Sequence, residues 1–156
     1  MLSIPWPSPD PDLVLLQVTS TDESFILVVK SLRTSASCPI CSKQSSHKHS
    51  QYTRKVQDLP ISDKKVELLI LTRRWFCDQL DCTVKVFTER YDWLSPNGRR
   101  TKRTEEVLRK LAFSSSCLSA EKVARAAHMP VSHDTLLNLV RHAHIKPEVS
   151  PFCGYR

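Results

Sequence analysis

The sequence predicts an α+β fold, with a small β-sheet module in the first part of the chain and a helical module after it. Three observations predict this fold. Segments rich in apolar and β-branched residues precede Pro96-Asn97-Gly98, and apolar residues at helical spacing follow it. Four cysteines also form two short pairs inside the strand-rich part. We therefore expect an extended lead-in (1–12), a β-rich domain (13–95), a helical domain (100–145) and a tail (146–156).

Two apolar segments near the N-terminus, Leu13–Val18 and Phe25–Leu32, predict strands joined by the polar turn Thr19–Ser24. The same composition predicts strands at Val66–Phe76 and Val84–Thr88. Four prolines among the first twelve residues favour an extended lead-in, because proline supplies no backbone donor.

Three polar segments connect these strands. Arg33–Gln51 is rich in Ser, Lys and His and is expected to be a loop without a core of its own. Asp58-Leu59-Pro60 is expected to be a turn, and Cys77–Cys82 a polar knuckle.

Apolar residues at helical spacing predict three helices, at Thr104–Phe113, Ser119–His128 and His133–His144. Ser132 is a suitable N-cap for the third. The second and third helices, with the short turn between them, have the proportions of a helix-turn-helix, whose second helix lies in the DNA major groove. A three-helix packing unit with a polar outer face is the alternative.

Composition excludes several classes of protein. With only two glycines in 156 residues, the chain has neither a G-x-G-x-x-G dinucleotide motif nor a Walker A loop. Its apolar runs are far shorter than the ~18–20 residues of a membrane span, so we expect no membrane partner. No secretory signal is visible, which predicts a cytoplasmic location where cysteines stay reduced.

The positive charge is concentrated in the middle of the chain. The net charge is +7, yet the first 29 residues contain no Lys or Arg, whereas residues 30–110 contain 18 Lys/Arg and 9 Asp/Glu. This segment predicts a polyanionic partner, with double-stranded DNA as the first choice. A basic surface without a specific partner is the alternative.

The two cysteine pairs predict a zinc site. Cys38 and Cys41 form C-x2-C, and Cys77 and Cys82 form C-x4-C, spacings that allow two thiolates from each turn to bind one tetrahedral Zn²⁺. The alternatives are ordinary reduced thiols, a redox C-x-x-C, or a ligand set in which His47 or His49 replaces a cysteine. The other two cysteines, Cys117 and Cys153, are expected to be free.

The candidate DNA contacts fall into two groups. The first contains residues of the basic runs, which would contact phosphates, and the second contains polar side chains of the third predicted helix, which would reach base edges. The candidate phosphate contacts are Arg73, Arg74, Arg99, Arg100, Lys102 and Arg103. The candidate base contacts are His133, Thr135, Asn138 and Arg141.

Several motifs occur in an order typical of one family. C-P-x-C is followed by H-x-x-Y-x-R (His49, Tyr52, Arg54), D-L-P, R-R-W-F-C, C-x4-C and V-F-x-E-R (Val86–Arg90), with D-T-L at Asp134. In this order the chain resembles the N-terminal region of ISL-three-family insertion-sequence transposases, over residues 13–145. The resemblance implies that the four paired cysteines bind zinc in a zinc-ribbon-like module and that the helical tail is the family's helix-turn-helix.

The resemblance also bears on activity. Transposases of this family continue into an RNase H-like domain with an acidic triad and two metal ions. We expect this chain to lack that domain and to have no enzymatic activity. Its expected role is recognition of the terminal inverted repeats of an insertion sequence, with full-length transposase or a second copy of the chain as further partners.

Two other classes of function stay open at this point. An enzyme could use Asp58, Asp78, Asp81 and Glu89 as a nuclease site, or Cys117 and His128 as a hydrolase pair. A zinc-ribbon protein-interaction module, or an inhibitory transposase fragment, is the other alternative.

Overall fold

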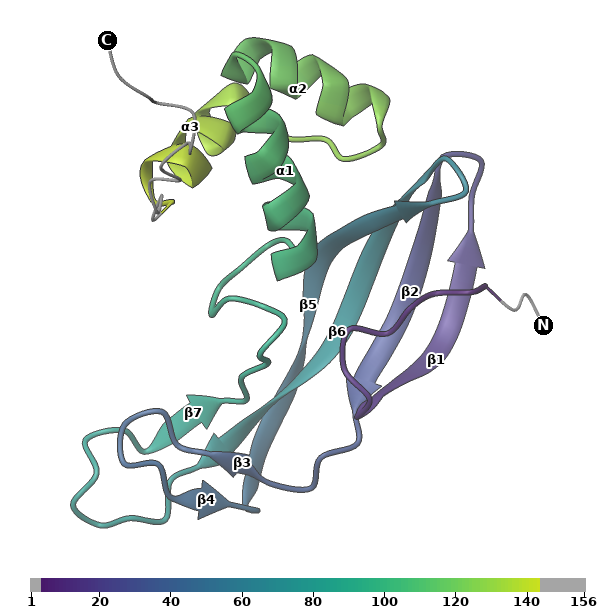
Figure 1. Cartoon of the computed structure of the whole chain (residues 1–156). Helices are drawn as coiled ribbons and strands as arrows, with labels where there is room; N and C mark the ends of the chain where they lie inside the picture. Colours follow the sequence, from purple (N-terminus) through teal and green to yellow (C-terminus); the bar gives the residue numbers. More distant parts are fainter. Residues whose placement is uncertain (1–3, 144–156) are drawn as a thin grey trace, which may run out of the picture.

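The computed structural model describes residues 4–143, in which one mixed sheet carries the three helices at one of its ends (Figure 1). The sheet order is β1-β2-β6-β5, and β7 pairs with the end of β6 beyond β2. Strands β2 and β6 are parallel, and the other neighbours are antiparallel. The bounds are β1 Leu13–Ser20, β2 Ser24–Ser31, β5 Lys48–Ile61, β6 Lys64–Phe76 and β7 Val86–Thr88; a separate hairpin contains β3 Ala36–Ser37 and β4 Gln44–Ser45.

The predicted α+β class is confirmed, and the three helices follow the sheet. They are α1 Lys102–Ser114, α2 Cys117–Ala126 and α3 His133–Arg141. Each begins after a hydroxyl N-cap (Thr101, Ser116 and Ser132) whose side chain accepts a hydrogen bond from the backbone three residues on. Helix α3 ends earlier than predicted, and its predicted last residue and the tail 146–156 lie outside the described residues.

The predicted turn at Asp58-Leu59-Pro60 is wrong, because this segment belongs to β5. The chain turns at Ser62 and Asp63, whose φ values of 48° and 56° suit a tight two-residue hairpin. Proline interrupts the ladder of a central strand, but Pro60 lies on an edge strand, where the pairing between Asp58 and Ile61 is irregular. The turn residues of this hairpin are Ser-Asp, without the glycine that usually marks it.

The segment 33–51 is also more ordered than predicted. It contains the β3–β4 hairpin, and its last residues begin β5. Within the hairpin, Ser42 N–H donates to the Cys38 carbonyl (2.9 Å) and Cys38 N–H to the Lys43 carbonyl (2.8 Å). The expectation that this segment lacks its own core is consistent with the structure, since Cys38 packs with Trp75 and Phe87 from β6 and β7.

The main core lies on one face of the sheet, where alternate residues of the central strands are fully buried. Leu27 and Val29 of β2 face Leu68 and Ile70 of β6, and Val56 of β5 extends this layer. Tyr91, Trp93 and Leu94, which follow β7, and Ile4 and Trp6 of the lead-in pack against it.

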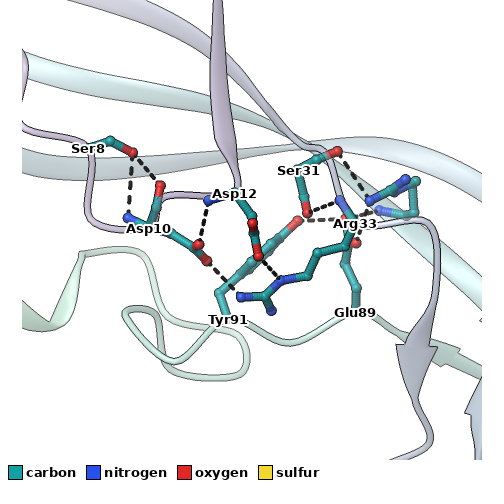
Figure 2. Close-up of polar contacts among 8 residues, drawn as sticks. Ser8, Asp10, Asp12, Ser31, Arg33, Glu89 and Tyr91 are labelled. Atoms are coloured by element: carbon teal, nitrogen blue, oxygen red, sulfur yellow. Dashed lines mark hydrogen bonds and ion pairs between the residues drawn. The ribbon is translucent and has the colours of Figure 1, made fainter.

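The lead-in is held to the end of β2 by Arg33. Its guanidinium donates to Asp10 (3.1 Å) and Asp12 (3.0 Å), as Figure 2 shows, and Asp10 is buried. Beside this group, Tyr91 donates to Glu89 (2.6 Å; Figure 2). The buried Glu89 carboxylate also pairs with Arg73.

Asp58 connects three parts of the chain that are far apart in sequence. Its carboxylate is fully buried and accepts hydrogen bonds from Trp6 Nε1 (2.9 Å), Thr101 Oγ1 (2.8 Å) and Arg103 Nε (2.7 Å), with a second ion-pair contact from Arg103. Burial alone would raise the pKa of this carboxyl, but the hydrogen bonds from Arg103, Trp6 and Thr101 outweigh burial and lower it. Asp58 is therefore an ionised group that joins the lead-in, β5 and the start of α1.

Backbone hydrogen bonds reinforce this junction. Gln57 N–H donates to the Arg99 carbonyl (2.9 Å), and Thr101 N–H donates to the Gln57 carbonyl (3.0 Å). Leu59, two residues further along β5, packs against the helical core. The helices are thus attached to the edge of the sheet. Among the described residues, no helix is both long and apolar enough to cross a membrane.

We predict that Asp58→Asn lowers the free energy of unfolding by about 2–4 kcal/mol. This is somewhat less than the ~3–5 kcal/mol of a broken, fully buried pair, because the Arg103 side chain is 28% exposed. Urea unfolding monitored by circular dichroism measures the change. Asp22→Asn, in an exposed turn, is the matched control, and an equal effect of both variants contradicts the prediction.

The same pair predicts a pH dependence. The folded-state pKa of Asp58 is lowered, so its stabilisation is fully present above the unfolded pKa of about 3.9 and is lost as pH falls through the folded value. Unfolding free energies measured from pH 6 downward should fall more steeply in the wild type than in Asp58→Asn. Parallel curves would show that Asp58 is not ionised in the native state.

Candidate functional site

The four paired cysteines meet at the end of the sheet opposite the helices (Figure 1). Cys38 and Cys41 lie in the turn of the β3–β4 hairpin, while Cys77 directly follows β6 and Cys82 precedes β7. The Cys38 and Cys82 sulfurs are 3.8 Å apart, those of Cys41 and Cys77 are 3.5 Å apart, and all four lie within 4.8 Å of one another. The two knuckles thus bring their thiols together although 35 residues separate them in sequence.

This geometry fits a zinc ion. In a tetrahedral site with Zn–S bonds of ~2.3 Å, neighbouring sulfurs are about 3.8 Å apart. A disulfide requires a sulfur–sulfur distance of ~2.05 Å, and all four cysteines are free thiols. Cys38, Cys41, Cys77 and Cys82 are therefore suited to hold one Zn²⁺ as a closed, structural site.

The electrostatics of the cluster favour a bound cation. The backbone N–H of Cys41 lowers the pKa of the Cys38 thiol to about 7. At Cys77 the Gln79 N–H also lowers the pKa, but desolvation and the neighbouring sulfurs outweigh it and raise the pKa to about 12. Four thiolates this close together repel one another, and a divalent cation removes that repulsion.

Side chains around the cluster hold the two knuckles together. Asp78 of the second knuckle contacts His47 Nδ1 (2.7 Å) and accepts a hydrogen bond from Ser45 Oγ (3.2 Å). The other histidine considered as a ligand, His49, packs edge-on against Phe76. Within residues 4–143, the four sulfurs alone form a group able to bind a metal, so the all-cysteine ligand set is the one that the structure supports.

The predicted phosphate contacts divide into engaged and exposed cations. Arg73 pairs with Glu89 (3.2 Å) and lies over the Trp75 ring, and Arg103 is bound to Asp58. Burial lowers the pKa of Arg100, which is half-buried beside β5. The exposed cations are Arg74, Arg99 and Lys102. In the run from Arg99 to Arg103, Arg99 and Lys102 therefore face the solvent, whereas Arg100 and Arg103 pack against the protein.

The predicted base contacts divide in the same way. The His133 ring lies 3.0 Å from the Glu121 carboxylate, which also accepts a hydrogen bond from the His133 backbone N–H. Both contacts with His133 lower the pKa of Glu121. The Thr135 hydroxyl lies 3.0 Å from that of Ser132. Asn138 and Arg141 are exposed, on the side of α3 opposite the buried Leu136.

Two structural roles were not recognised from the sequence. Glu121 fastens α2 to the start of α3, and Asp58 fastens the sheet to α1. The sequence holds a weak signal that Asp58 is buried, because Asp58 lies two residues from the buried Val56 and so on the same face of β5. No comparable signal in the sequence relates Glu121 to His133.

The fold and the cysteine cluster define this part of the chain as a zinc-binding ribbon. Residues 34–82 match the family described as the zinc finger of transposase IS204/IS1001/IS1096/IS1165. The match covers less than half of the chain, and over this segment it confirms the resemblance to ISL-three transposases. Comparisons with curated proteins and with solved structures gave no match.

We predict that the purified chain contains one zinc per molecule and that Cys38→Ser abolishes stoichiometric zinc. The expected cause is loss of one of four thiolate ligands, whose combined binding stabilises the fold. Metal analysis by mass spectrometry and the visible absorption of the Co²⁺-substituted protein measure this. Cys117→Ser, a free thiol in α2, is the control and should retain the metal. Full zinc in both variants would contradict the four-cysteine site.

Proposed function

We propose that this chain is the zinc-stabilised DNA-recognition part of a transposase and that it binds the terminal inverted repeats of an insertion sequence. A transposase zinc finger indicates DNA binding, and the helices that follow supply a surface suited to base recognition. The observation that carries the proposal is the exposed pair Asn138 and Arg141 on α3. Asn can form two hydrogen bonds with adenine, and Arg can do so with guanine.

In this proposal α2, the turn and α3 act as a helix-turn-helix, and α3 enters the major groove. The bond between Glu121 and His133 holds α3 against α2, so α3 is presented as part of a rigid unit. Arg99 and Lys102, exposed near the start of α1, would contact phosphates and supply sequence-independent affinity. The protein would act in the cytoplasm, where its thiols remain reduced.

We propose further that the chain contributes recognition and not chemistry. Three of the four carboxylates considered for a nuclease are engaged elsewhere: Asp58 binds Arg103, Glu89 binds Arg73 and Tyr91, and Asp78 contacts His47. Cys117 is the first residue of α2 and His128 lies two residues beyond its last residue, Ala126, so the length of the helix, about 14 Å at ~1.5 Å per residue, separates them. These arrangements favour structural roles for the three carboxylates and argue against a hydrolase pair.

We predict that Asn138→Ala weakens binding to the preferred duplex by about 5- to 150-fold, the equivalent of ~1–3 kcal/mol for one bidentate base contact. Selection from a randomised duplex library identifies that duplex, and fluorescence anisotropy compares it with a scrambled one. Affinity for the scrambled duplex should not change, because only phosphate contacts hold it.

Two controls accompany this experiment. Gln17→Ala removes an exposed amide from β1, far from α3, and should bind like the wild type. A salt titration of the wild type should show log K falling linearly with log salt, with a slope near −0.9 per phosphate contact. Equal affinity for the selected and scrambled duplexes would overturn the proposal of sequence recognition.

A further inference from the structure

A groove beside the zinc cluster collects side chains that neither bind zinc nor belong to the helices. It lies where β5, β6 and β7 meet, between the Pro39-Ile40 turn of the first knuckle and the turn at Ser95–Asn97, and has a volume of about 340 Å³. Its floor includes Tyr52 and Arg54 of β5. Motifs that the zinc site leaves unused therefore converge on one surface.

The register of the strands places partly exposed aromatic and apolar side chains on the face of the sheet that holds this groove. Tyr52 pairs with Thr72, Arg74 with Thr88 and Phe76 with Val86, and residues of the same parity on β6 share one face. The exposed fractions are 36% for Tyr52 and Val86, 44% for Phe76 and 61% for Ile40. Large apolar side chains are thus left open to solvent on this face.

Two arginines, Arg54 and Arg90, line the groove, and a third, Arg74, lies beside it against Tyr52. The Arg74 guanidinium lies 5.0 Å from the centre of the Tyr52 ring, and Arg54 donates to the Gly98 carbonyl (2.9 Å), which leaves most of its donors free. Arg90 is exposed and, within the described part of the chain, forms no ion pair. The acid that lines the groove, Glu89, is buried and paired with Arg73.

The groove therefore offers a flat aromatic ring, apolar neighbours and an excess of positive charge. A nucleotide is complementary to all three, because its base stacks on aromatic rings and its phosphate binds arginine. A volume of about 340 Å³ is at the lower end of the range for small-ligand sites, which suits a single nucleotide and not a helix ~10–12 Å wide.

We propose that this groove binds unpaired nucleotides of a DNA strand, with a base stacked on Tyr52 and phosphates held by Arg54, Arg74 and Arg90. The site is separate from α3, which lies at the other end of the sheet (Figure 1). It rests on the proposed function only in that both ligands are DNA. A strand exposed when a duplex end opens has the required chemistry.

Fluorescence anisotropy of the zinc-loaded full chain with a labelled oligo-dT of twelve nucleotides tests this proposal. We expect Tyr52→Leu to bind the single strand on the order of tenfold more weakly, as expected for the loss of one base stack, and Tyr52→Phe to bind like the wild type. Tyr52 is partly exposed, so both variants should keep their zinc and their unfolding midpoint.

A second pair of variants tests the charge. Arg90→Gln should weaken single-strand binding several-fold, whereas Lys30→Gln, an equal change of charge at an exposed position of β2, should not. Cross-linking of an iododeoxyuridine-containing strand, followed by mass spectrometry, should label Tyr52. None of these substitutions should alter the affinity for the duplex selected through α3.

The outcomes separate this proposal from the proposed function. Duplex binding without single-strand binding, or equal losses for Arg90→Gln and Lys30→Gln, would overturn the groove and leave duplex recognition intact. Loss of duplex binding alone would overturn recognition by α3 and leave the groove. Polyglutamate can be added as a competitor, at a carboxylate concentration equal to the phosphate concentration of the oligo-dT. If it displaces the strand, the surface binds acidic protein segments instead, which also overturns the proposal.

Discussion

The buried carboxylate of Asp58 is the interaction on which the arrangement of the two modules depends. An ionised group inside a protein must be paired, and here the partners come from the lead-in and from the start of α1. Because all of these partners act on one carboxylate, the helices cannot move away from β5 without exposing or unpairing it. The position of α3 relative to the sheet follows from this constraint.

The zinc cluster performs the corresponding task at the other end of the sheet. Lys48, where β5 begins near the knuckles, is ten residues from Asp58, or about 33 Å at ~3.3 Å per residue. The β5–β6 hairpin spans this distance: Asp58 lies in β5, and Cys77 directly follows β6. At the zinc end the hydrophobic core is small, and the metal adds stability that the core alone would not supply. At the other end the ion pair of Asp58 and Arg103 joins the sheet to the helices.

The distribution of the arginines explains how a strongly basic segment can serve structure and binding together. Arg73 and Arg103 neutralise buried carboxylates and are part of the fold. Arg74, Arg90 and Arg99 are exposed and remain available to an anionic ligand. The net positive charge of the segment is therefore presented at separate places, near the zinc cluster and near the start of α1, instead of forming one uniform basic surface.

The sequence alone determined the class of fold, the cysteine ligands and the existence of the helices, because these depend on local spacing and periodicity. Whether a residue has a partner depends on contacts between distant segments, so Asp58 was interpreted as a turn residue and Arg103 as a phosphate contact. Pro60 also obscured the continuation of β5, since its tolerance there depends on an edge position that only strand pairing defines. The groove beside Tyr52 arose in the same way, from strand register and not from spacing. Tertiary structure alone decided which charges are buried, because burial and pairing are properties of the folded chain.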